Sequence, residues 1–111
     1  MHNKSTLLIS GILTFIHVLE AHGAWRETTG MSTIRASHTA TVLQDGTVLI
    51  VGGRGGFPYL ANAEIFDPKT ESWTSIENMS TPRYDHTATM LMDGRVLVVG
   101  HLGRPVHCRI I

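Results

Sequence analysis

Short apolar runs separated by polar turns organise most of this chain. The segment "TVLIV" (47–51) is apolar on both faces, as expected of a strand buried between two neighbouring layers. Before it, the β-branched residues of "HTATVL" (38–43) predict a strand, and Asp45-Gly46 tolerate the positive φ of a type I′ hairpin turn. "NAEIF" (62–66) and "ESWTSI" (71–76) predict two more strands, joined by a type I turn at "DPKT" (67–70). The pattern therefore predicts four antiparallel strands.

The same pattern returns 48 residues later. Trp25 aligns with Trp73, "HTAT" at 38–41 aligns with "HTAT" at 86–89, and "VLIVG" at 48–52 aligns with "VLVVG" at 96–100. Between 25–53 and 73–101, sixteen of the 29 aligned positions are identical. A repeat of about 50 residues, with four antiparallel strands in each copy, is typical of the blades of a β-propeller.

A double glycine follows the buried strand, and an aromatic residue and a Trp follow with six residues between them. These residues are Gly52, Gly53, Phe66 and Trp73. They resemble the signature of the kelch repeat family, which usually has Tyr where Phe66 stands. The combination of "HTAT", Asp-Gly and "VLVVG" resembles secreted kelch proteins and galactose-oxidase-like domains. For the glycines, the expected role is a close approach of the backbone to its neighbour, where a Cβ would collide.

The resemblance covers residues 24–103 and implies an all-β fold, an incomplete kelch β-propeller of about one and a half to two four-stranded antiparallel blades. Residues 36–76 form the complete blade and residues 84–101 a partial one, in which Gly100 repeats Gly52. Trp25 belongs to the last strand of a preceding blade. Residues 104–111 depart from the template, and we expect no third or fourth strand in this divergent tail.

The number of blades falls short of a closed ring. Propellers have four to eight blades, and repeat arrays need about three units to bury a continuous core. We therefore expect the chain to be a fragment of a larger propeller or a truncated gene product. The alternative is a chain that associates with itself to complete the ring.

The first 23 residues have the layout of a secretory signal peptide. Lys4 precedes the apolar stretch 7–19, and the small residues Ala21 and Gly23 favour cleavage before Ala24. Two other interpretations stay open, a buried element of the fold or an uncleaved anchor. A signal peptide implies a secreted protein, and the alternative is a cytoplasmic one. In a secreted chain, Asn78-Met79-Ser80 is an acceptor for N-glycosylation.

Composition excludes some classes of partner. Nine Lys and Arg balance nine Asp and Glu, so no strong basic charge favours nucleic acid or an acidic membrane surface. No apolar run reaches the roughly 18 residues of a membrane span. Cys108 is the single cysteine, so the chain forms no internal disulfide.

Catalytic chemistry has little support in the sequence. His38 and His86 occupy equivalent positions and could converge on a metal, but no carboxylate or cysteine joins them at ligand spacing. We expect these histidines to be structural, with no metal and no cofactor. No nucleophile motif is present, and Tyr59 and Tyr84 do not form the copper-binding arrangement of galactose-oxidase-like enzymes. We therefore expect no enzyme activity.

Binding has better support. The loops that join the second strand to the third, and one blade to the next, share one face of a propeller. Arg and aromatic side chains anchor many protein interfaces, and this face would display Arg54, Phe57, Tyr59, Arg35, Arg83 and Tyr84. A structural role for Arg35 and Arg83, as residues that bridge blades, stays equally open. We expect a non-catalytic module that binds a protein or a glycan. The alternative is a remnant of a secreted propeller enzyme, a galactose-oxidase-like oxidase or a sugar epimerase, that lacks its active-site blades.

Overall fold

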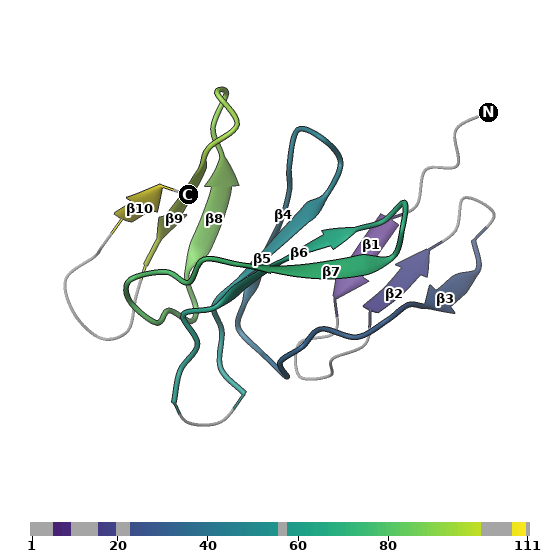
Figure 1. The fold of residues 1–111 in the computed structure, drawn as a ribbon, viewed down its shortest axis with the longest axis horizontal. Coiled ribbons are helices and arrows are strands. Elements are labelled where there is room, and N and C mark those ends of the chain that lie inside the picture. Colours follow the sequence, from purple (N-terminus) through teal and green to yellow (C-terminus); the bar gives the residue numbers. More distant parts are fainter. Residues whose placement is uncertain (1–5, 10–15, 20–22, 56–57, 101–107, 111) are drawn as a thin grey trace.

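The computed structural model describes residues 6–9, 16–19, 23–55, 58–100 and 108–110. Within them the protein is all-β, with strands in three antiparallel sheets (Figure 1). This confirms the predicted fold class. The strands are β1 (Thr6–Ile9), β2 (Ile16–Leu19), β3 (Trp25–Glu27), β4 (Thr39–Val42), β5 (Val48–Val51), β6 (Ala63–Asp67), β7 (Ser72–Ile76), β8 (Thr87–Met90), β9 (Val96–Val99) and β10 (Cys108–Ile110). No helix in the described part of the chain is long and apolar enough to cross a membrane.

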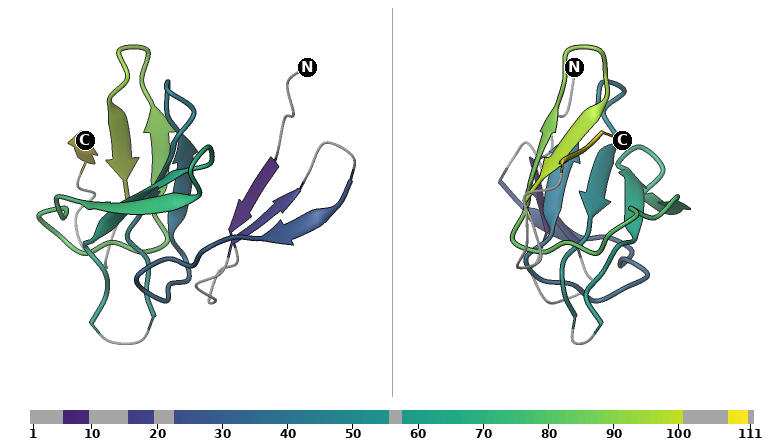
Figure 2. Two further views of the ribbon diagram at one scale, coloured as in Figure 1. Left: turned by 45° about the vertical axis from the view of Figure 1, so that its right-hand side comes forward. Right: turned by 90° about the vertical axis from the view of Figure 1, so that its left-hand side faces the viewer.

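The central sheet has the order β4-β5-β6-β7, in which each strand pairs with the next along the chain. Val51 pairs with Thr39 on one side and with Ala63 on the other, so β5 lies inside the sheet. All four residues of β5 are buried, because the strand is covered on both faces as well as at both edges. The four strands fall within residues 36–76, where the sequence predicts a complete blade (Figure 2).

The turn between β4 and β5 differs from the predicted type I′ turn. Gly46 has a φ of +86°, but Asp45 is not among the residues with positive φ. The Gly46 amide donates to the Leu43 carbonyl at 3.0 Å, and the Asp45 carboxylate accepts from the Thr47 amide at 3.0 Å. This pattern is that of a type I turn followed by a left-handed glycine. The Asp45 carboxylate stabilises this turn by accepting the Thr47 amide.

The third sheet has the order β10-β9-β8. β8 and β9 are the predicted partial blade, and Thr87 pairs with Val99 as Thr39 pairs with Val51. The expectation that the tail adds no third strand is wrong, because Cys108–Ile110 pair with β9 in the register Cys108 to Val99. Backbone groups on the outer edge of β9 need hydrogen-bond partners whatever the side chains are, so a segment that has lost the repeat can still pair there.

The N-terminal sheet has the order β1-β2-β3 and contains Trp25. Leu19 pairs with Trp25 in β3, and Phe66 pairs with Trp73 at the corresponding place in the central sheet. β1 and β2 lie within the predicted signal peptide, of which residues 1–5, 10–15 and 20–22 lie outside the described residues. Cleavage after Gly23 stays a prediction.

The core has two clusters, one on each face of the central sheet. Val48, Ile50 and Phe66 pack with Met31 and Trp73 on one face. On the other face, Leu49, Val51 and Ala63 pack against Val96 and Val98 of β9, which joins the two blades. Val99 is half-buried, whereas its repeat equivalent Val51 is fully buried, because Val51 lies between two blades and Val99 does not.

Candidate binding face

The double glycine lies where the two blades approach each other most closely. Gly52 has a φ of +65°, and a Cβ on it would lie 2.5 Å from the Arg83 carbonyl oxygen and 2.8 Å from Cε1 of His86. Gly53 has a φ of +100°, and its Cβ would lie 2.6 Å from the Ala36 carbonyl oxygen. The close approach allows a backbone hydrogen bond, in which the Gly53 amide donates to the Arg83 carbonyl at 2.6 Å. These glycines therefore have the close-approach role that the sequence predicts.

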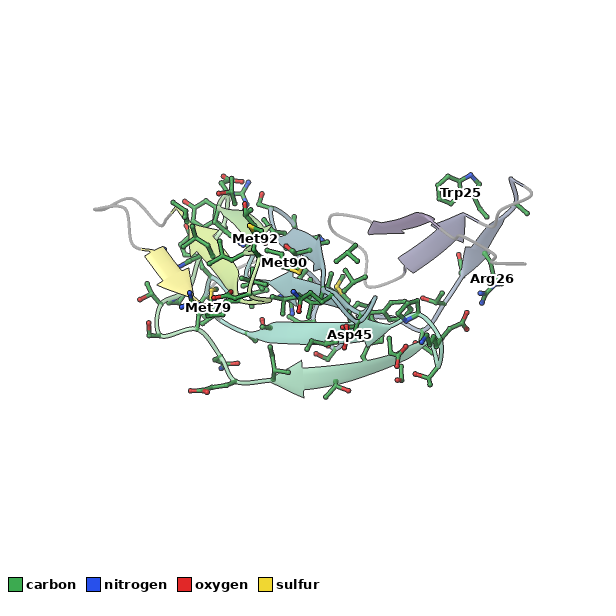
Figure 3. All side chains as sticks on the ribbon, turned by 90° about the horizontal axis from the view of Figure 1, so that it is seen from above. Trp25, Arg26, Asp45, Met79, Met90 and Met92 are labelled. Atoms are coloured by element: carbon green, nitrogen blue, oxygen red, sulfur yellow. The ribbon has the colours of Figure 1, made fainter. Side chains whose placement is uncertain are left out.

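The aromatic pair of the motif closes the other end of the central sheet. The Phe66 and Trp73 rings lie with their centroids 4.9 Å apart and their planes at 45°. Nε1 of Trp73 donates to the Thr29 carbonyl at 3.0 Å, so the segment after β3 is tied to β7. Trp25, the repeat equivalent of Trp73, is half-exposed, and Figure 3 shows Trp25 and Arg26 on opposite sides of the N-terminal sheet. Its segment forms a strand as predicted, but Trp25 is not among the core residues.

Arg35 lies in the interior and holds the segment before β4 against β5 and β6. Its side chain is 0% exposed, Nη1 donates to the Gly52 carbonyl at 2.8 Å, and Nη2 lies 2.9 Å from Oε2 of Glu64. Oε1 of Glu64 accepts from the Ser32 amide at 3.1 Å. Burial lowers the pKa of Arg35, and the nearby Glu64 carboxylate opposes that shift. The ion pair is thus buried and hydrogen-bonded on both sides.

Arg83 repeats this arrangement in the next blade. Its side chain is 3% exposed, and Nη1 donates to the Gly100 carbonyl as Nη1 of Arg35 does to the Gly52 carbonyl. The prediction that Arg35 and Arg83 belong to an exposed binding face is therefore wrong. Each guanidinium donates a hydrogen bond to a backbone carbonyl at the end of the buried strand of its own blade. Each side chain is therefore buried. Both arginines are structural residues, but their guanidinium hydrogen bonds lie within their own blades and do not bridge two blades as the sequence analysis suggested.

Glu64 and Thr39 are important residues that the sequence analysis did not single out. A carboxylate inside the apolar pattern of "NAEIF" is a signal for a buried cationic partner. Thr39 lies on β4 and its Oγ1 is 2.9 Å from Nε2 of His86, which precedes β8. The "HTAT" motif thus links the two blades through the Thr of one copy and the His of the next.

Three of the predicted binding residues gather beside the interblade end of the sheets. The Tyr59 and Tyr84 rings stack with centroids 4.6 Å apart and planes at 28°. The Arg54 guanidinium lies over the Tyr84 ring, with Cζ 5.4 Å from the centroid. Arg54 is exposed and both tyrosines are half-exposed. Arg54, Tyr59 and Tyr84 are called the tyrosine cluster below.

Backbone hydrogen bonds connect the two loops that carry the tyrosine cluster. The Leu60 amide donates to the Gly53 carbonyl at 2.9 Å, and the Arg83 amide donates to the Leu60 carbonyl at 3.0 Å. The pKa of Tyr84 is raised, first by the neighbouring Tyr59 and then by desolvation, while Arg54 opposes the shift. The Tyr84 hydroxyl therefore stays protonated at neutral pH and can donate a hydrogen bond to a ligand.

The other predicted site residues have less to contribute. Phe57 lies outside the described residues. Asn78 is exposed between β7 and β8, and it precedes Met79, which is buried and whose amide donates to the Ala61 carbonyl at 2.8 Å. In the described part of the chain, no three His, Cys, Asp or Glu side chains are placed to hold a metal ion. His38 and His86 both lie close to the interblade contact.

Known proteins share a sequence motif and a fold with this chain. Residues 35–80 match the family model described as the kelch motif. A search of solved structures matches 87 chains, among them a novel fungal alcohol oxidase of the AA5 family, with catalytic diversity, in complex with copper. The likeness to that oxidase has a TM-score of 0.73 and 24% sequence identity, and it covers 79% of this chain and 21% of the oxidase chain. No curated protein matches this sequence.

The protein spans about a fifth of the length of that oxidase, so what the two share is the fold of neighbouring blades. The motif match covers the central sheet together with the Arg35 segment before it and Asn78 after it. The matched residues include Gly52 at the close approach of the blades and the Phe66–Trp73 pair. Residues 35–80 therefore carry the kelch motif, and the protein has the fold of a partial kelch-type β-propeller.

Proposed function

We propose that this kelch module is a non-catalytic binding protein whose ligand, a protein or a glycan, docks on the tyrosine cluster. The observation that carries the proposal is the stacked pair of Tyr59 and Tyr84 beneath the exposed guanidinium of Arg54. Tyrosine gives a large contact area at a low cost in conformational entropy, because its side chain has only two rotatable bonds. Arg and Tyr are also the residue types on which binding energy concentrates at interfaces.

The cluster is pre-organised, which favours binding. Its two loops are fastened by the hydrogen bonds among Gly53, Leu60 and Arg83, and Arg83 is itself buried. A ligand that docks there does not have to order these loops, so less of its interaction energy is lost. The hydrogen-bonded loops hold the two tyrosines in position, and the exposed parts of the rings are available for contact with a ligand.

Copper chemistry like that of the fungal oxidase does not fit the described residues. No group of three His, Cys, Asp or Glu side chains among them can hold a metal, and Tyr59 and Tyr84 face each other and Arg54. A remnant of a propeller enzyme remains the alternative, and it would still need active residues from other blades. The kelch module by itself supports binding better than catalysis.

We further propose that the protein is secreted, through the signal layout of residues 1–23. The exposed Asn78 supports this proposal, since a sequon can be modified only where an enzyme of the secretory pathway can reach it. Asn78 lies between β7 and β8, in the connection between blades that also carries Tyr84. A glycan there would flank the tyrosine cluster.

The test uses the purified chain, an array of purified glycans and a displayed library of random peptides. We expect a binder in one of these sets, and the double variant Tyr59→Ala/Tyr84→Ala should weaken it by about 30-fold, the effect of losing a hot spot of about 2 kcal/mol. Arg54→Ala should weaken it too. Met92→Ala is the matched control, because Met92 is fully exposed in the β8–β9 turn, which lies at the other end of β8 from the connection that carries Tyr84 (Figure 1). Binding that survives the double tyrosine variant, or no binding in either set, would refute the proposal.

A further inference from the structure

The two histidines of the "HTAT" motif lie at the contact between blades. A non-glycine residue with positive φ precedes each of them, Ser37 at +54° and Asp85 at +51°, and the Asp85 amide donates to the Ser37 carbonyl at 3.1 Å. This pair of kinks places His38 before β4 and His86 before β8 in the same way. The repeat therefore builds one histidine into the inner end of each blade.

The His86 ring is packed against both blades. Thr39 of β4 is hydrogen-bonded to Nε2 of His86, and Cε1 of His86 would lie 2.8 Å from a Cβ on Gly52. On its own blade, a Cβ on Gly100 would lie 3.2 Å from the Cα of His86. The ring is 6% exposed, so water does not surround it. Any change in its hydrogen-bonding needs must be met inside the contact.

The neutral ring fits this position, and the protonated ring does not. A neutral imidazole has a single N–H, which Thr39 Oγ1 can accept from Nε2. A protonated imidazole has a second N–H at Nδ1, and Nδ1 of His86 is buried without a hydrogen-bond partner in the described residues. Nδ1 of His38 is in the same situation. For His38 a buried N–H⁺ without an acceptor is costly, and for His86 the Val51 backbone offsets only part of that cost, so protonation opposes the contact.

Taken together, the groups that face the two histidine rings also favour the neutral form. The pKa of His38 is held below its ordinary value of 6.5 by burial, then by Arg35 and then by His86. The pKa of His86 is also lowered, chiefly by burial and further by Arg83, while the Val51 backbone and Asp85 oppose the shift. Glu64 is already paired with Arg35. The groups that face the histidines from β4, β5, β6 and the segments before β4 and β8 therefore favour neutral rings.

We propose that His38 and His86 make the contact between the two blades sensitive to acid, so that their protonation opens it. The direction follows from linkage. A histidine whose pKa is lower in the folded protein binds its proton more readily when unfolded or opened. The stabilisation is complete above the unfolded value of about 6.5 and is lost as the pH falls below it. The contact is closed at neutral pH and opens in a mildly acidic medium.

The first experiment measures the thermal midpoint Tm of the full chain between pH 7.5 and pH 5.5, above the range in which ordinary carboxylates titrate. We expect Tm to fall by about 5 °C or more. The double variant His38→Gln/His86→Gln should lose most of that fall, because glutamine keeps a polar group and does not titrate. Asp85→Asn removes an acidic group that favours the protonated His86, so it should lower the folded-state pKa further and enlarge the fall. A double variant with an unchanged fall would overturn the proposal.

Two further measurements keep the proposal falsifiable if the double variant does not fold. Nuclear magnetic resonance titration of the wild-type ring protons should give pKa values below 6.5 for His38 and His86. Between pH 7.5 and pH 5.5, the protection factors measured by hydrogen exchange should fall more in β4, β8 and β9 than in β6 and β7, which lie away from the contact. Ring titrations at or above 6.5, or an equal fall of the protection factors in all of these strands, would show that the histidines do not control the contact.

Discussion

Oγ1 of Thr39 lies 2.9 Å from Nε2 of His86, and this hydrogen bond joins two copies of the same four-residue motif. In the sequence, "HTAT" suggests only a strand that occurs twice. In the structure, the first Thr of one copy meets the His of the next, 47 residues later. The identical residues are thus explained by a contact between repeats as well as by the fold of each repeat.

Removing the hydroxyl of Thr39 tests this contact. Thr39→Val keeps the β-branched shape and leaves Nε2 of His86 buried without its partner, which should lower the free energy of unfolding by about 1–2 kcal/mol. Thr87→Val is the matched control, since Thr87 is the repeat equivalent, is exposed, and makes only a long 3.4 Å bond to the Val99 carbonyl. It should change stability by about 0.5 kcal/mol or less. Denaturant unfolding would measure both, and equal effects would refute the role of the interblade bond.

The buried pair of Arg35 and Glu64 should be sensitive to the loss of one partner. Glu64→Ala leaves a guanidinium that is 0% exposed without its carboxylate, and a loss of about 3–5 kcal/mol is expected. The double variant Arg35→Met/Glu64→Leu should be more stable than Glu64→Ala, because no uncompensated charge remains. Arg95→Ala is the control, since Arg95 pairs with Asp93 on the surface and should cost less than about 1 kcal/mol. An equal loss in Glu64→Ala and Arg95→Ala would contradict the importance of burial.

Two glycines with positive φ allow the close approach of the blades to be tested separately from backbone strain. Gly46 has a φ of +86° with open space around its Cβ position, so Gly46→Ala should cost about 1–2 kcal/mol from conformation alone. Gly52→Ala carries a similar strain and in addition forces a Cβ to within 2.5 Å of the Arg83 carbonyl oxygen. Overpacking of this kind adds about 1–3 kcal/mol. Chemical denaturation should therefore give a much lower free energy of unfolding for Gly52→Ala than for Gly46→Ala. Similar free energies for the two variants would show that the blades can separate at little cost.

Secretion and glycosylation can be tested together. When the chain is expressed in a eukaryotic cell line, we expect the medium to contain a protein that begins at Ala24 and carries a glycan on Asn78. Mass spectrometry before and after N-glycosidase treatment would detect that glycan. Ser80→Ala removes the sequon and keeps Asn78, so it should abolish the glycan without affecting export. A chain that stays in the cell with residues 1–23 attached would contradict the signal peptide and favour the strands β1 and β2 as permanent parts of the fold.

The sequence by itself determined the repeat and the elements of each blade. The apolar run Val48–Val51 became the inner strand, Phe66 and Trp73 paired, and Gly52 and Gly53 took the close approach. These features follow from side-chain patterns only a few residues long, and a repeated pattern must fold in the same way twice. The position of Asp45 in a turn also followed from the sequence, although the turn type did not, because two types of turn both accept Asp-Gly.

Only the tertiary structure decided which polar residues are buried and which remain available to a ligand. Arg35 and Arg54 are both arginines beside loops, yet Arg35 is buried on Glu64, 29 residues away, and Arg54 lies exposed over Tyr84. Similarly, β10 pairs with β9 through its backbone, which the loss of the side-chain repeat does not prevent. Local patterns fix the strands, because they depend on neighbours in sequence. Burial depends on what the folded chain places opposite a side chain, and for Arg35 that is Glu64 on β6.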